Sequence, residues 1–142
     1  MNLGDPISLK AWLAPRGADP HALAKDERMA LVASLAQDLM AGIAKVVPVL
    51  PVPLVATVFV AHPERAFTEI ELKAEVMSLV ARLEAKGARV HVPRRDRDYA
   101  FTVGLRLLTS RHAVLLEDGL YRASSAELHL LRYYAASIEH LL

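Results

Sequence analysis

The 142-residue sequence contains no cysteine and few aromatic residues, which make up only 6% of it. The absence of cysteine excludes disulfides, thiolate zinc sites, iron–sulfur clusters and cysteine nucleophiles. Neither sign of charge predominates, because there are 17 Lys and Arg residues and 16 Asp and Glu residues, for a net charge of +1. This balance provides no overall electrostatic footprint for nucleic acid and argues against nucleic acid as a partner.

The sequence also lacks the long apolar run of a membrane span, and residues 2–6 have neither the basic nor the apolar region of a signal peptide. The longest run without a charged residue or His extends over residues 46–61 and contains three prolines. A spanning helix needs about 20 apolar residues, and internal prolines would break it. We therefore expect no transmembrane helix. The run forms either part of the core or a contact with another domain or a membrane surface, and the candidate residues for such a contact are Val49, Leu50, Val52, Leu54 and Val55.

Hydrophobic residues are abundant, at 54% with a mean hydropathy of +0.25, so the chain can bury a sizeable core. Its length is that of one domain. We divide it into an arm over residues 1–26 and a helical domain over residues 27–142. Within the arm, Ser8 is expected to cap a short helix.

Apolar spacing predicts the main helices. Leu31, Leu35, Leu39 and Ile43 repeat every four residues and predict a helix from about residue 26 to 47. The apolar stripe that they form is expected to face the core, with Leu35 as a core residue. A short apolar helix is expected over residues 53–61. Thr68 and Glu71 form a capping box for a third helix, which ends at Gly87 and carries five apolar residues on one face: Leu72, Val76, Leu79, Val80 and Leu83.

Turn and cap signals organise the second half of the chain. Asp96 or Asp98 can cap a helix over residues 98–110, and Asp118-Gly119 between apolar runs predicts a hairpin. Residues 89–92 alternate like a short strand that could join the same sheet. Ser124 and Glu127 are read as a second capping box, which opens a last helix that reaches Leu142. The predicted fold class is mainly α (α+β), with about five helices and a small antiparallel hairpin, and a winged-helix-like order is one interpretation.

Three stretches resemble the C-terminal region of the bacterial membrane-bound glycerol-3-phosphate 1-O-acyltransferases and their dihydroxyacetone-phosphate acyltransferase relatives. They are residues 2–9 (NLGDPISL), residues 49–56 (VLPVPLVA) and residues 131–141 (LRYYAASIEHL). Their order and spacing also agree with the family, so the resemblance covers essentially the whole chain. One position departs from the pattern, because Ala136 stands where the family usually has Asn.

The resemblance implies a role in phospholipid biosynthesis, in an enzyme that transfers an acyl group from acyl carrier protein or acyl-CoA to glycerol-3-phosphate. The family's chemistry lies in an N-terminal α/β domain with a His-x4-Asp pair followed by phosphate-binding motifs. This sequence contains no Glu-Gly and no Phe-x-x-Arg. We therefore interpret the chain as a non-catalytic C-terminal accessory domain, inactive alone and peripheral to the cytoplasmic side of the inner membrane. The resemblance also implies that the arm over residues 1–26 continues from the catalytic domain. Its expected partners are the catalytic domain, the membrane surface or acyl carrier protein.

Two His-x4-Asp matches do occur, at His21 to Asp26 and at His91 to Asp96. The motif has low specificity, and neither match is followed by phosphate-binding motifs, so we assign no catalytic residue. No pair of histidines has a metal-ligand spacing with support from other residues, and we expect neither a metal nor a cofactor.

The densest basic cluster offers a candidate contact with an anionic ligand or a lipid headgroup, because Arg guanidinium groups match phosphate oxygens. Its members are Arg89, Arg94, Arg95 and Arg97. The alternative interpretation is a solvated loop before the next helix.

A free-standing winged-helix-like module that binds protein or nucleic acid is the alternative function. The order of a helix, a capped helix, a strand, a helix and a hairpin fits it. The helix after Thr68 argues against DNA, because it carries four acidic side chains and three basic ones: Glu69, Glu71, Glu75 and Glu84 against Lys73, Arg82 and Lys86.

Overall fold

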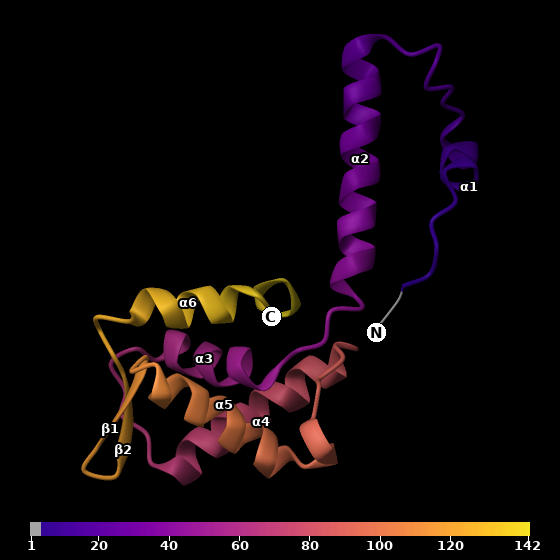
Figure 1. Ribbon diagram of the computed structural model, residues 1–142. Coiled ribbons are helices and arrows are strands. Elements are labelled where there is room, and N and C mark those ends of the chain that lie inside the picture. The colour runs from indigo at the N-terminus through magenta and orange to yellow at the C-terminus, as the bar shows by residue number, and fades with distance from the viewer. Residues whose placement is uncertain (1–3) are drawn as a thin grey trace. The chain divides into compact units, whose positions relative to one another are not determined.

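A computed structural model describes residues 4–142, which form six α-helices and one two-stranded antiparallel sheet (Figure 1). Helix accounts for 61% of the chain, and this confirms the predicted class of a mainly α fold with a small hairpin. The chain divides into two compact units, one ending at Val47 and the other beginning at Pro48. The sequence-based division at residue 26 differs from this boundary by the length of one helix.

The first unit consists of α1 (Leu9–Leu13), a 3₁₀ turn (Ala14–Arg16) and α2 (Lys25–Ala44). Ser8 caps α1 as predicted, since its hydroxyl oxygen accepts a hydrogen bond from the Ala11 N–H at 3.4 Å. Trp12 joins the two helices, because its indole Nε1 donates to Asp38 Oδ2 at 2.7 Å. Arg16 binds the same carboxylate at 3.2 Å and stacks on the Trp12 ring with its Cζ 3.7 Å from the ring centroid. The predicted arm therefore folds back on α2.

Helix α2 differs from its prediction as a core helix. No residue of Lys25–Ala44 is buried, and the expected core stripe is only half-buried at Leu31 and Leu35 and exposed at Leu39 and Ile43. The reason is the small size of this unit, in which a five-residue helix and an extended segment cover one side of a 20-residue helix. The expectation that Leu35 belongs to the core is thus wrong.

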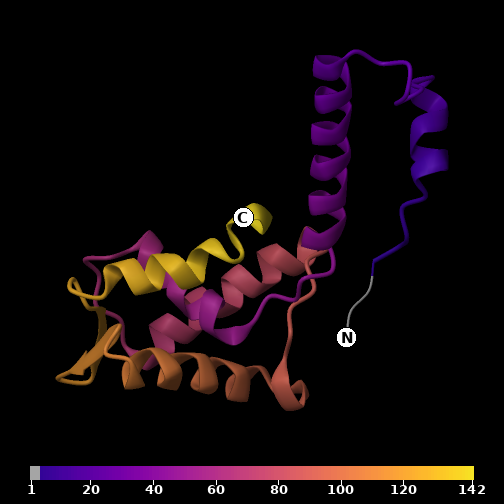
Figure 2. The same cartoon turned by 45° about the horizontal axis from the view of Figure 1, so that its top comes forward.

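The second unit is built around α3 (Pro51–Ala61), which packs against α6 (Leu128–Ala136), α5 (Arg97–Ser110) and α4 (Glu69–Ala85). Figures 1 and 2 show α3 enclosed by these helices. A 3₁₀ turn (Pro93–Arg95) precedes α5, and another (Glu139–Leu141) follows α6. The predicted core face of α4 is confirmed, because Leu72, Val76, Leu79, Val80 and Leu83 are all buried.

The apolar run over residues 46–61 is mainly core. Val49, Leu54 and Val55 are buried, so these three do not form the surface contact for which they were candidates. The cause is the central position of α3, which has neighbours on several sides. Leu50 remains 47% exposed and Val52 is partly exposed, so only these two candidates stay at the surface.

In the second unit the helix caps agree with the sequence at two positions and differ at a third. Thr68 Oγ1 accepts from the Glu71 N–H at 3.3 Å, and Glu71 Oε2 accepts from the Thr68 N–H at 2.8 Å, which confirms the first capping box. Asp96, not Asp98, caps α5 by accepting from the N–H groups of residues 98 and 99. The second predicted capping box is wrong, because α6 begins only at Leu128 and no side chain in the described residues caps it.

The hairpin is confirmed as β1 (Val114–Glu117) and β2 (Leu120–Ala123), with Glu117 opposite Leu120. Asp118 and Gly119 have φ values of 51° and 78°, as a two-residue type I′ turn requires. Tyr121 also forms an antiparallel bridge with Phe67. The predicted 89–92 strand does not join this sheet, since Val90 forms a single parallel bridge with Val49 instead.

Candidate functional site

The basic cluster lies in the loop between α4 and α5 and at the start of α5. Arg97 Nη2 binds both carboxylate oxygens of Glu84 at 3.0 Å, so this guanidinium is neutralised by α4. The acidic neighbours are also engaged, because Asp96 caps α5 and Asp98 binds Lys73 Nζ at 2.8 Å. Arg97 is therefore the least suited of the four candidates to bind an external anion.

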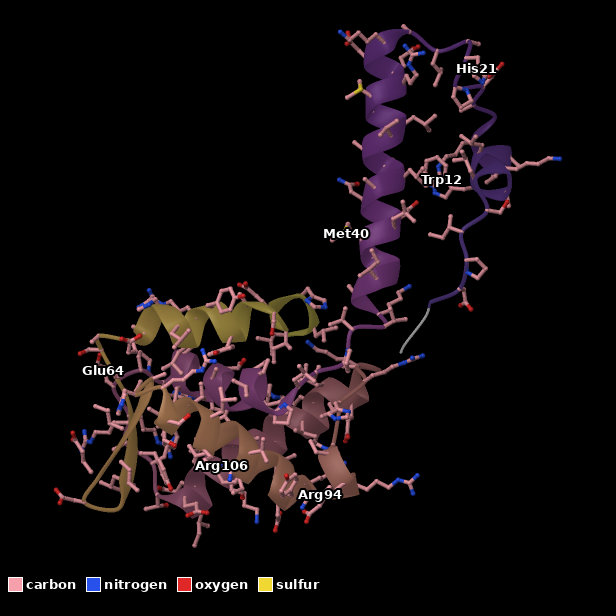
Figure 3. All side chains as sticks on the ribbon, in the orientation of Figure 1. Trp12, His21, Met40, Glu64, Arg94 and Arg106 are labelled. Carbon is pink, nitrogen blue, oxygen red and sulfur yellow. The ribbon has the colours of Figure 1, made fainter. Side chains whose placement is uncertain are left out.

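The other three arginines are exposed, and within residues 4–142 none of them forms an ion pair. Arg94 stacks on Tyr99 with its Cζ 4.3 Å from the ring centroid. Arg94 and Arg95 both have a φ of 57°, which places the backbone of two consecutive residues in the left-handed region. Figure 3 shows Arg94 at the loop before α5. Arg89, Arg94 and Arg95 thus form an exposed basic loop whose guanidinium groups have no acidic partner among residues 4–142.

The two His-x4-Asp matches are not assembled into pairs. In the described part of the chain, no hydrogen bond or ion pair joins His21 to Asp26 or His91 to Asp96. Asp96 instead holds the first turn of α5, and the His91 N–H donates to the Val49 carbonyl at 2.8 Å. A general base needs an orienting partner within hydrogen-bond distance, and neither match has one in residues 4–142.

Two side chains have displaced pKa values with structural causes. Hydrogen bonds from the Thr68 N–H and hydroxyl hold the pKa of the Glu71 carboxyl below its usual value, which follows from the capping box. Burial raises the pKa of the Tyr121 hydroxyl, and the nearby Glu69 charge adds to this. Among residues 4–142 no group of three or more metal-ligating side chains occurs, and no helix there is long and apolar enough to cross a bilayer.

The exposed face of α2 is a feature that the sequence interpretation missed. Five residues at spacings of three and four lie along it: Met29, Val32, Ala36, Met40 and Ile43. Met40 is 64% exposed, and the other large side chains of this stripe are more than half exposed. Figure 3 shows Trp12 between α1 and α2, with Met40 on the opposite side of α2. We call these five residues the α2 stripe, and their spacing could have identified it as a second apolar face.

A groove on the second unit was also missed. It has a volume of about 590 Å³ and lies between α5 and α6 over the start of α3. Leu50, Val52, Pro53 and Leu107 contribute apolar side chains, and Arg111 is its one charged lining residue among those that the structure describes. The α6 tyrosines line its other side, with Tyr133 exposed and Tyr134 partly packed on the core. No sequence spacing links residues 50, 107 and 133, so only the fold brings them together.

The surface of residues 4–142 thus has three distinct features: the arginines without acidic partners, the α2 stripe and the groove between α5 and α6. The family model described as the glycerol-3-phosphate acyltransferase C-terminal region matches residues 1–142. The chain belongs to this family, and the resemblance found in its three sequence stretches is confirmed. No curated protein matches the chain significantly. No solved structure matches it significantly either.

Proposed function

We propose that this chain is a non-catalytic accessory region of a glycerol-3-phosphate acyltransferase-like enzyme, which binds the catalytic domain through the α2 stripe. The observation that carries the proposal is a 20-residue helix, Lys25–Ala44, in which no residue is buried and whose outer face is apolar. Exposed apolar surface of this extent is characteristic of a binding face. Membership of a family of acyltransferase C-terminal regions makes the catalytic domain of such an enzyme the expected partner.

The basic loop supports a second contact, with anionic headgroups at the cytoplasmic side of the inner membrane. Arg89, Arg94 and Arg95 are exposed and have no acidic partner in residues 4–142. Each basic residue near an anionic surface contributes about 1 kcal/mol of attraction. Three such residues give a weak, salt-sensitive contact, which suits a region that assists an enzyme of phospholipid synthesis at the membrane surface.

We expect the double variant Val32→Asp/Met40→Asp to lose the support that the chain gives to acyl transfer. The two charges would have to be buried against the catalytic domain, which is unfavourable without a partner. The measurement is acyl transfer to the sn-1 hydroxyl of glycerol-3-phosphate by a catalytic domain of this family, with and without the chain. The chain alone should form no product, and its addition should raise the activity or the half-life of the catalytic domain.

The matched control is Ala30→Asp/Ala41→Asp, because both alanines are exposed on the side of α2 away from the stripe. This control loses more helix propensity than the test variant and should still support activity. If both double variants lost the same amount of support for acyl transfer, docking through the α2 stripe would be contradicted. Turnover by the isolated chain that disappears in His91→Ala would contradict the non-catalytic role.

A winged-helix-like binding module is the second candidate, favoured by the order of elements in the second unit. Helix α3, the extended residue Phe67 bridged to Tyr121, then α4, α5 and the hairpin follow the winged-helix order. In that order α5 is the helix that would contact DNA, and its Arg97 is already paired with Glu84 of α4, which argues for a protein partner rather than DNA. We expect no measurable binding to random duplex DNA at 50 mM salt. Binding that weakens steeply as salt increases would favour a nucleic acid module instead.

A further inference from the structure

The groove between α5 and α6 combines an apolar floor with one unpaired cation. Leu50 is a surface residue here, and Leu107 is half-buried beside it. Arg111 follows the last residue of α5, is exposed, and forms no ion pair with any residue that the structure describes. A ligand that fills the groove therefore meets an apolar surface along most of its length and a guanidinium at one side.

We propose that this groove binds a single-chain anionic amphiphile, that is, one acyl chain with a carboxylate or phosphate headgroup on Arg111. A volume of about 590 Å³ falls in the range of small-ligand sites. The Arg111 guanidinium matches the paired oxygens of either headgroup. Tyr133 lies at the same groove with an exposed side chain, and its hydroxyl can donate a further hydrogen bond to the headgroup.

A neighbouring hollow on the other side of α6 shows why an anion is favoured at this groove in particular. That hollow has a volume of about 470 Å³ and is lined by residues that include both Arg132 and Glu139. Its lining thus contains one charge of each sign. The groove beside Arg111 has no carboxylate among its lining residues, so of these two sites it is the one whose charge is complementary to an anionic headgroup.

The experiment titrates the full chain with decyl phosphate and decanoate below their micelle concentrations and with decanol below its solubility limit, and follows amide and methyl NMR shifts. We expect saturable binding of both anions, with shifts at Val52, Leu107 and Arg111, and weaker binding of decanol. The Arg111→Gln variant should bind both anions roughly tenfold more weakly and decanol unchanged, as expected for loss of a charged hydrogen bond. Tighter binding of decyl phosphate or of decanoate identifies the headgroup, and either result supports the proposal.

Two further variants separate the site from general charge and folding effects. Arg106→Gln is the matched control, because Arg106 is exposed on the same helix and does not line the groove. It should leave all three affinities within twofold of the unsubstituted chain. Ala136→Phe places a ring in the groove wall without removing a charge and should weaken all three ligands. Circular dichroism checks that each variant is folded.

The proposal is overturned if neither anion saturates below its micelle concentration, or if decanol binds as tightly as the anions. It is also overturned if Arg106→Gln weakens the binding of the anions as much as Arg111→Gln does. A third contrary result would be shifts at the groove residues that follow the protein concentration, as self-association produces, and not the ligand concentration. The groove belongs to the second unit and its test involves no acyl transfer. A negative result for the groove therefore does not contradict docking through the α2 stripe. A negative result for the α2 stripe likewise does not contradict ligand binding in the groove.

Discussion

Phe59→Ala should lower the unfolding free energy of the second unit by about 3–5 kcal/mol, as expected when a buried phenylalanine is truncated. The Phe59 side chain is completely buried on the central helix α3. Its ring meets Phe67 edge to face, with centroids 5.6 Å apart and an interplanar angle of 90°. Since Phe67 also bridges Tyr121, the substitution opens a cavity beneath the contact between α3 and the hairpin.

The change can be measured by denaturant unfolding with near-UV circular dichroism at the tyrosine bands, because all four tyrosines lie beyond residue 98. Ile70→Ala is the control, since Ile70 is 82% exposed on the neighbouring helix α4. An exposed truncation of this kind changes stability by no more than about 0.5 kcal/mol. If the denaturant midpoint of Phe59→Ala shifted no further than the midpoint of Ile70→Ala, Phe59 would not be a core residue.

The sequence predicted the second unit well because its signals are local. The Thr68–Glu71 capping box, the Asp118-Gly119 turn and the apolar stripe of α4 each depend on residues within a few positions of one another. The second capping box failed because the same residue pattern can form a turn before the helix. The Ser124 carbonyl accepts from the Glu127 N–H at 3.2 Å, so these residues are used before α6 begins.

Burial was harder to predict than helix formation. The run of residues 46–61 and the stripe of α2 look equally apolar in sequence, yet α3 is enclosed by three helices whereas α2 is covered on one side. Hydrophobic spacing identifies a face that needs a partner but not which element supplies it. The same limit applies to the groove, because Leu50, Leu107 and Tyr133 meet only through the packing of α5 and α6 on α3.

Gly104→Ala should destabilise the second unit by about 1–3 kcal/mol, as expected for overpacking where two helices touch. Gly104 lies in α5 at its contact with α3, and a Cβ atom there would be 2.7 Å from the Pro51 carbonyl oxygen and 3.1 Å from Val55 Cγ2. The first neighbour is backbone and cannot rotate away, so α5 would have to move from α3. This cost exceeds the gain of about 0.5–1 kcal/mol that alanine brings to a helix interior.

Gly42→Ala provides the matched comparison, because Gly42 is also within a helix, α2, but a Cβ atom there meets no described atom within 4 Å outside its own helix backbone. Only the propensity gain remains, so we expect stabilisation of the first unit by about 0.5–1 kcal/mol. Fluorescence of Trp12, which hydrogen-bonds to Asp38 of α2, follows this unit during unfolding. Opposite signs for two identical substitutions would show that helix contact, not glycine itself, decides the effect, whereas stabilisation by both would mean that α3 and α5 are not in close contact at Gly104.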